Sequence, residues 1–215
     1  MFTNTINYFF YFCNWDRSGF CFNKISAEFR IKPGGASAVF NPPEFQNSFK
    51  MPDFTKYIKH AKGLGAKEAR IISPKTIVVA EWVRMKCQFG CDGFGQSLTC
   101  PPYSPTPEFT RRMLTFYKHA LIVHDGDYTD IHGLIPKLER EIFLDGYYKA
   151  FGMGSGPCQL CAKCAKFCRH PDKTRPSMEA CGIDVYSTVR SNGFPIKVLN
   201  MPGCKGNYYG IVLID

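Results

Sequence analysis

The sequence predicts a single α/β or α+β domain, in which helices flank a small mixed sheet and cysteine-rich loops join these elements. Short β-branched apolar segments alternate with segments whose apolar residues recur at helical spacing. The cysteines are concentrated in the loops between them. The 215 residues are 45% hydrophobic and 21% charged, which suffices for one buried core and excludes a disordered chain. No run of about 18 apolar residues marks a membrane-spanning helix.

The first fifty residues differ from the rest. They hold 13 of the 32 aromatic residues, and the run from Tyr8 to Phe12 has neither a helical nor a strand period. We expect no secretion signal, because no basic segment precedes this run and no small-residue cleavage site follows it. We interpret residues 1–50 as an irregular extension or an artefact of start-site assignment, with Met51 as the functional start; a flexible partner-binding arm is the alternative. Residues 51–215 form the predicted cysteine-rich domain.

The first half of this domain is expected to contain two helices and one strand. Apolar residues at helical spacing from Phe54 to Ala61 predict a helix that ends at the glycines following it. The β-branched apolar segment 75–80, preceded by Pro74, predicts a buried strand. Residues 106–108 (Thr-Pro-Glu) are typical of a helix start, with a capping hydroxyl, a proline and an acid at the positive end of the helix. The expected apolar face of that helix comprises Phe109, Met113, Phe116, Tyr117 and Ala120.

The second half is expected to contain two strands and two helices. Residues 120–123 and 209–214 are continuous apolar runs that predict buried strands. The longest helix is expected from Asp130 to about Gly146, with Glu139 and Glu141 as solvated charges on its polar side. Ser177 is expected to cap a helix that continues to about Arg190 and ends at an Asn-Gly pair.

Four cysteines lie within eleven residues, in the pattern Cys158-x2-Cys161-x2-Cys164-x3-Cys168. This is the spacing of bacterial ferredoxins, in which the fourth cysteine ligates a second [4Fe–4S] cluster. Structural zinc sites instead combine two pairs of ligands from separate turns. The spacing therefore favours iron–sulfur loops over zinc, which stays as the alternative cofactor.

A second cysteine set, Cys87-x3-Cys91-x8-Cys100, precedes the first. With Cys181, the two sets supply eight thiolates, enough for two complete [4Fe–4S] sites. We assign one cluster to Cys158, Cys161, Cys164 and Cys181, and the other to Cys87, Cys91, Cys100 and Cys168. Exchanging Cys168 and Cys181 satisfies the same count, so the pairing stays open. Cys204 has no partner pattern and is interpreted as a half-buried apolar residue.

Other residues near the four cysteines at 158–168 could serve a cluster. The glycines at 152, 154 and 156 permit positive φ and let backbone N–H groups approach a negative cluster; a phosphate loop is disfavoured, because no Lys-Ser/Thr pair follows. His170 is expected to have an outer-shell or structural role. Basic residues interleaved with the cysteines either neutralise cluster charge, bind an acidic redox partner or form a solvated face. They are Lys163, Lys166, Arg169, Lys173 and Arg175.

Four blocks of the sequence resemble the "domain of unknown function 2284" family of predicted metal-binding proteins. They are AEWVR at 80–84 leading into Cys87 and Cys91, TCPPYSPTP at 99–107, FLDGYYKAF at 143–151, and RPSMEACGIDV at 175–185. The resemblance covers essentially residues 55–215. It implies metal binding through the eight cysteines and implies no particular reaction. Residues 1–50 lie outside it, and Cys204 belongs to none of the four blocks.

The leading hypothesis is a cytoplasmic iron–sulfur protein that transfers single electrons to a redox partner protein. No catalytic acid, base or nucleophile motif is evident. The alternatives are an iron–sulfur enzyme, accessory or redox sensor with an open cluster site, and a zinc-stabilised nucleic-acid-binding protein. The formal charge of +9 suggests nucleic acid, but two oxidised clusters of about −2 each would lower it to about +5, and to about +3 without residues 1–50. We therefore expect neither a nucleic-acid nor a membrane partner.

Overall fold

A four-stranded sheet organises the domain in the computed structural model, which describes residues 53–126, 130–200 and 204–215. The strands lie in the order β1-β2-β4-β3, and every pair is antiparallel. They are β1 (Glu68–Ile72), β2 (Ala120–Asp125), β3 (Phe151–Met153) and β4 (Tyr208–Leu213). The α+β class is confirmed, and the sheet is antiparallel where mixed strand directions were expected. The boundary predicted at residue 50 stays a prediction, since residues 1–50 lie outside the described ranges.

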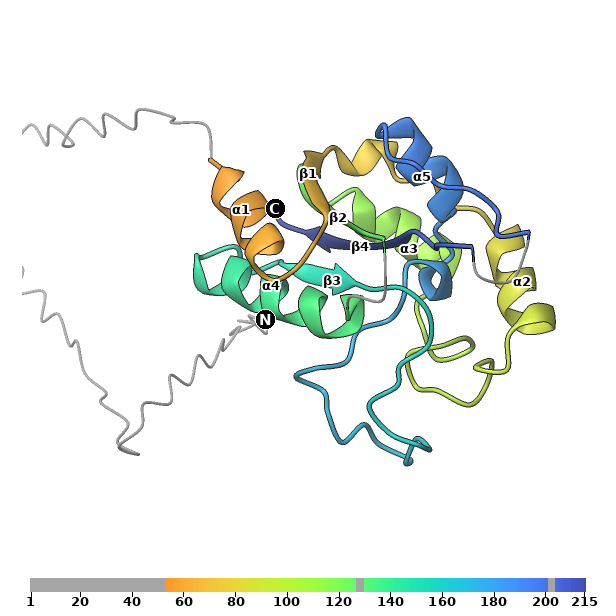
Figure 1. Ribbon diagram of the computed structural model, residues 1–215. Coiled ribbons are helices and arrows are strands. Elements are labelled where there is room, and N and C mark those ends of the chain that lie inside the picture. The colour runs from red at the N-terminus through yellow and green to blue at the C-terminus, as the bar shows by residue number, and fades with distance from the viewer. Residues whose placement is uncertain (1–52, 127–129, 201–203) are drawn as a thin grey trace, which may run out of the picture. The chain divides into compact units, whose positions relative to one another are not determined.

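Five α-helices and two 3-10 turns surround the sheet within the described residues (Figure 1). The helices are α1 (Thr55–Gly63), α2 (Trp82–Gly90), α3 (Pro107–Leu114), α4 (Ile131–Leu144) and α5 (Val185–Ser191). The turns are η1 (Pro74–Thr76) and η2 (Glu179–Cys181). No helix in the described ranges has the length and apolarity needed to cross a lipid bilayer.

Both faces of the two central strands are covered. Leu121 and Val123 of β2 face a core built with α1 and α4, whereas Ala120 and Ile122 face a second core with η2 and α5. Continuous apolar runs are more typical of parallel strands, which helices cover on both sides. Here an antiparallel sheet is covered on both sides, which explains why the sequence pattern did not reveal strand direction.

Helix α4 lies close against β3 and β4 because both strands carry a glycine beneath it. A Cβ added to Gly210 would lie 2.6 Å from Ile135 Cδ1, and one added to Gly152 would lie 2.5 Å from Ile135 Cγ2. The helix begins where predicted: Asp130 Oδ1 accepts a hydrogen bond from the backbone N–H of Gly133 at 2.9 Å. The predicted helices beginning at Phe54 and Thr106, and both predicted strands at 120–123 and 209–214, are also confirmed within one or two residues at their starts.

Segment 75–80 is not the predicted strand. It begins as η1 and continues as an extended strap with one isolated bridge, between Val79 and Ile183. Its backbone groups pair outside the sheet: Val78 N–H donates to Thr188 Oγ1 at 3.0 Å, and Val78 O accepts from Asp184 N–H at 2.8 Å. The backbone of Val78 therefore attaches this β-branched segment to the part of the chain that carries η2 and α5.

The single helix predicted from Ser177 is divided in two. Ser177 does cap η2, accepting from the backbone N–H of Ala180 at 3.0 Å, but Gly182 then takes a left-handed conformation with φ of 78°. Asp184 starts α5 afresh, accepting from the backbone N–H of Ser187 at 3.0 Å. In α3, the buried face also differs from the prediction. It carries Thr110 and Leu114, and Phe109 of the predicted aromatic face is exposed.

Candidate metal centre

The first cysteine group is brought together by α2 and the loop that follows it. Cys87 lies in α2 and Cys91 is its C-cap residue, so a spacing of four places both on one side of the helix. A Cβ added to Gly93 would lie 3.5 Å from the sulfurs of both Cys91 and Cys100. The Cys91 and Cys100 sulfurs are therefore separated by no more than twice that distance. They can both approach residue 93 because it has no side chain.

These three thiols line a cavity of about 450 Å³. It extends away from them between α2, the segment 155–157, the start of α5 and the start of β4. Its wall is largely apolar, and its polar side chains include Lys86, Ser177, Glu179 and Asp184. This volume lies within the range of small-molecule and cofactor sites, so the cavity has space for a metal cluster.

Burial favours the protonated form of the Cys87 and Cys100 thiols in the absence of metal. It raises the pKa of Cys87, and the neighbouring Glu179, Cys91 and Cys100 raise it further. Burial also raises the pKa of Cys100, against hydrogen bonds from Ser97 that lower it. A bound cation would replace these protons, because thiolates rather than thiols ligate metals.

The second group lies on the loop between β3 and η2. Cys158, Cys161, Cys164 and Cys168 all line one small pocket of about 20 Å³. Two of their sulfurs already accept hydrogen bonds: Thr174 Oγ1 donates to Cys158 Sγ at 3.3 Å, and the His170 backbone N–H donates to Cys168 Sγ at 3.4 Å. The donor set of four thiols fits a [4Fe–4S] cluster, and the small volume means that the exposed loop must open around one.

An ion pair fastens both ends of this loop to α4. Arg175 Nε and Nη2 donate to Glu139 Oε2 and Oε1, each at 2.5 Å, while the Gly152 N–H also donates to Oε2 at 2.7 Å. The side chains are only 19% and 12% exposed. The expectation of Glu139 as a solvated charge was therefore wrong, and Arg175 is not part of a free basic face.

The predicted glycines do not surround a thiol group. Gly152 N–H binds Glu139, Gly154 N–H donates to Pro176 O at 2.9 Å, and Gly156 N–H binds the Glu179 carboxyl group. Of the three, only Gly156 lines the first cavity. Their small size and, at Gly156, a φ of 70° serve the loop that carries the cysteines.

The two thiol groups are neighbours. Cys164 Sγ lies 4.0 Å from Ser97 Oγ, and Ser97 in turn lies beside Cys100, to which it is hydrogen-bonded. A charge on Cys158 also raises the pKa of Cys100, so these two sulfurs interact electrostatically across the groups. Loop 91–106 and loop 154–177 thus meet at one end of the domain (Figure 1).

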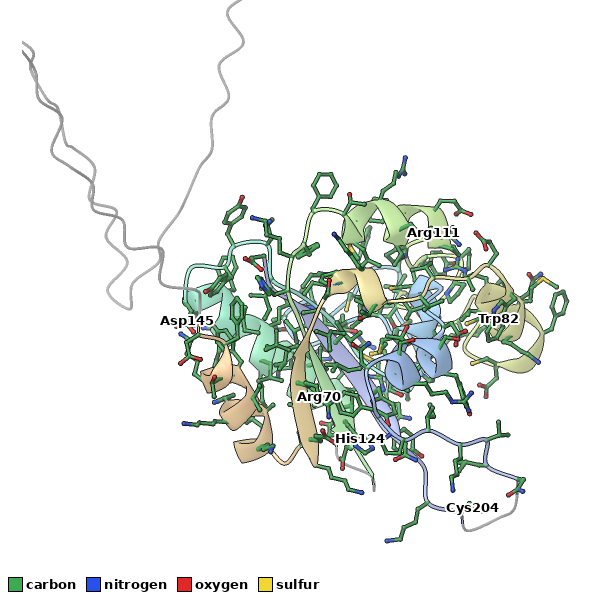
Figure 2. All side chains as sticks on the ribbon, turned by 90° about the horizontal axis from the view of Figure 1, so that it is seen from above. Arg70, Trp82, Arg111, His124, Asp145 and Cys204 are labelled. Atoms are coloured by element: carbon green, nitrogen blue, oxygen red, sulfur yellow. The ribbon has the colours of Figure 1, made fainter. Side chains whose placement is uncertain are left out.

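Cys181 and Cys204 lie apart from both groups. Cys181 is fully buried among Met178, Ile183 and other core residues and lines neither pocket. Burial raises the pKa of its thiol to about 12. Cys204 is exposed on the segment before β4, and Figure 2 shows it well away from Trp82 at the start of α2. Cys13 and Cys21 lie outside the described ranges.

Glu179 is a site residue that the sequence did not reveal. It belongs to η2, its side chain lines the cavity of the first group, and its backbone oxygen lies 3.9 Å from Cys87 Sγ. Burial raises the pKa of its carboxyl group. Only its place two residues before Cys181 could have drawn attention to it.

The separate thiols do not form a site for a single ion. Within the described ranges, no three or more Cys, His, Asp or Glu side chains are grouped closely enough to hold one metal ion. The described cysteines form no disulfide either. The arrangement is that of two sets of thiols facing two pockets.

Comparison with protein families matches residues 70–214 to one described as "Predicted metal-binding protein (DUF2284)". Comparison with curated proteins gave no match, and comparison with solved structures gave none either. The family match covers well over half of the 215 residues, including all eight cysteines of the predicted site. The chain therefore belongs to the DUF2284 family of predicted metal-binding proteins.

Proposed function

We propose that the protein holds two [4Fe–4S] clusters, one on each thiol group, and transfers single electrons. The observation that carries this proposal is the division of seven cysteines between two adjacent pockets, three in one and four in the other. Thiolates are the ligands that such clusters require. The hydrogen bonds to Cys158 and Cys168 support it further, because donors to the sulfurs of a cluster site orient the ligands and tune the metal.

The shared pocket supports moving Cys168 from the first group, to which the sequence assignment gave it, to the second. Cys168 lines the pocket of Cys158, Cys161 and Cys164, whereas Cys181 lies in the core. We therefore propose that Cys168 completes the second group. The cluster of Cys87, Cys91 and Cys100 then needs a fourth ligand from elsewhere.

Electron transfer requires little of the protein beyond positioning. A bound [4Fe–4S] cluster supplies a centre that gains or loses one electron. The chain supplies thiolates, a largely apolar cavity and contacts at Ser97 and Cys158 that bring the two groups together. No acid or base is needed.

An acidic protein is the proposed partner. Lys163, Lys166, Arg169 and Lys173 are exposed on the loop of the second group. Their charges would attract a partner to the edge of the cluster, and the attraction would weaken as salt is added. We place this exchange in the cytoplasm, because free thiols persist in a reducing compartment.

A second candidate is an enzyme or sensor whose cluster binds a small molecule. The cavity favours it, since about 450 Å³ exceeds what the three thiols need and reaches Tyr186 and Asn207 far from them. A ligand that changed the spectrum of the first cluster alone would support this candidate.

Metal and sulfide analysis of protein purified without oxygen tests the proposal. We expect about eight irons and eight sulfides per chain. Cys161→Ser should remove about half of both, and Cys204→Ser, the matched control, should remove none. Stoichiometric zinc without sulfide would contradict the proposal. Cys168→Ser should alter the second cluster and Cys181→Ser neither. Loss of the first cluster in Cys168→Ser and of the second in Cys181→Ser would restore the pairing assigned from the sequence.

A further inference from the structure

The wall of the first group's cavity includes three thiols and two carboxyl groups, those of Glu179 and Asp184. The Asp184 carboxylate is already engaged, because it accepts from the Ser187 backbone N–H at 3.0 Å and from the Ser187 hydroxyl at 2.5 Å. Cys87, Cys91 and Cys100 are the only cysteines of the described ranges that line it. A four-iron cluster takes four protein ligands in its complete form, so one ligand is missing. This step rests on the proposed function.

Glu179 has one carboxyl oxygen held and one left without a partner. Hydrogen bonds from its own backbone N–H, the Ser177 hydroxyl and the Gly156 N–H hold the group in place. Oε2 is sealed from solvent and has no hydrogen-bond partner. The carboxyl group is thus held on one side and without a partner on the other, in a residue that belongs to the wall of the cavity.

Arg84, whose charge acts on the Cys87 and Cys181 thiols, is engaged elsewhere. Arg84 donates to Ser104 Oγ at 3.0 Å, to Pro105 O at 3.0 Å and to Ala180 O at 2.7 Å. Buried carboxylates without a partner are rare, because they lose the hydration of a full charge; those that occur are paired or coordinate metals. The unpaired oxygen therefore points to a cation that the cavity holds.

We propose that Glu179 Oε2 is the fourth ligand of the cluster held by Cys87, Cys91 and Cys100. The carboxyl proton leaves for solvent as the oxygen binds iron. Oxygen is a harder ligand than sulfur, and iron–sulfur sites favour thiolate. The iron bound to Glu179 is accordingly the one that this cluster loses most readily. A molecule that entered the cavity would bind this iron by displacing Glu179.

Cys181 is the competing ligand. Its thiol is fully buried in the core that includes Ile72 and Val189, and it lines neither pocket. For Cys181 to reach the cluster, η2 would have to turn, which would break the hydrogen bond that the Ala180 backbone N–H donates to Ser177 Oγ. Glu179 lines the cavity with no such change.

Iron content and paramagnetic resonance of anaerobically reconstituted full-length variants test the assignment. Glu179→Gln keeps the size of the side chain but gives a weaker ligand; we expect it to lose about one iron per chain and to show a three-iron signal when oxidised. Glu179→Cys should restore the iron. Glu141→Gln, an exposed carboxylate on α4, is the matched control and should match the wild type.

The outcomes separate the two proposals. If Glu179→Gln retains all its iron and an unaltered spectrum, the ligand assignment is wrong; if Cys181→Ser alone loses the iron, Cys181 is the ligand. Wild-type protein without iron and sulfide would instead overturn the clusters themselves. Mössbauer spectra of the wild type need no variant: one iron of about eight should show oxygen coordination, and eight sulfur-bound irons would refute the proposal.

Discussion

The ion pair between Glu139 and Arg175 is expected to hold the second cysteine loop to the domain. Glu139→Ala removes the ion-pair partner of Arg175 in a site where the arginine side chain is only 19% exposed, leaving only the charge of Asp172 nearby. It also removes the acceptor of the Gly152 N–H. Breaking one side of a buried pair costs about 3–5 kcal/mol, and the partial exposure here places the expected loss near about 3 kcal/mol.

The assay is denaturant and thermal unfolding of the anaerobic protein, followed by circular dichroism. A loss of about 3 kcal/mol corresponds to a fall in Tm of roughly 6–12 °C for a domain of this size. Glu141→Ala on the same helix is the control, because its pair with His60 at 3.2 Å is exposed and worth at most about 1 kcal/mol. The iron content of the second group should fall in Glu139→Ala and not in the control.

A double-mutant cycle completes the test. Arg175→Met combined with Glu139→Ala removes the unpaired charge, so the double variant should be less destabilised than the two single losses predict when added. A loss in Glu139→Ala no larger than that of the control, or a fully additive cycle, would refute the reasoning that the pair acts as one buried unit.

Three further predictions concern single sites. Gly182→Ala should lower the free energy of unfolding by about 2 kcal/mol or more, because φ is 78° and the new Cβ would lie 2.7 Å from Pro107 Cγ; an unchanged melting temperature would contradict this. In metal-free folded protein, iodoacetamide should alkylate exposed Cys204 and spare Cys181, whose pKa is about 12; mass spectrometry of the peptides reads the difference. Burial lowers the pKa of His132, so the unfolded chain binds its proton first and stability should fall as pH drops below about 6.5, by at most about 1.4 kcal/mol per pH unit. His132→Gln should flatten that slope in urea titrations at several pH values.

Local signals in the sequence predicted the elements whose stabilisation is local. The capping groups of Asp130 and Thr106 make their hydrogen bonds within the first turn of α4 and α3, so their types and spacing suffice. Segment 75–80 failed because its β-branched residues pair with Thr188 and Asp184, more than a hundred residues away. β-Propensity indicates that a segment suits an extended backbone, but it does not indicate which segment will pair with it.

The same division applies to the candidate site. Spacing alone marks the four cysteines of the second group, because one short loop carries them. Spacing cannot separate Cys168 from Cys181, since both satisfy the ligand count. It gives no sign of Glu179 either, because this residue is recognised only as part of a cavity wall built from four distant segments. Glu139 is likewise predicted from the sequence to be a solvated charge, and only the folded structure shows its contacts with β3 and Arg175.

By itself, the sequence determined a domain of mixed helices and strands, the ends of the long helix and the membership of a metal-binding family, because each depends on residue types at short, regular spacing. Only the tertiary structure decided the antiparallel order of the strands, the separation of the thiols into two neighbouring pockets and the burial of Glu179. These depend on contacts between residues far apart in the chain. Burial and unpaired polar groups exist only once those contacts have formed.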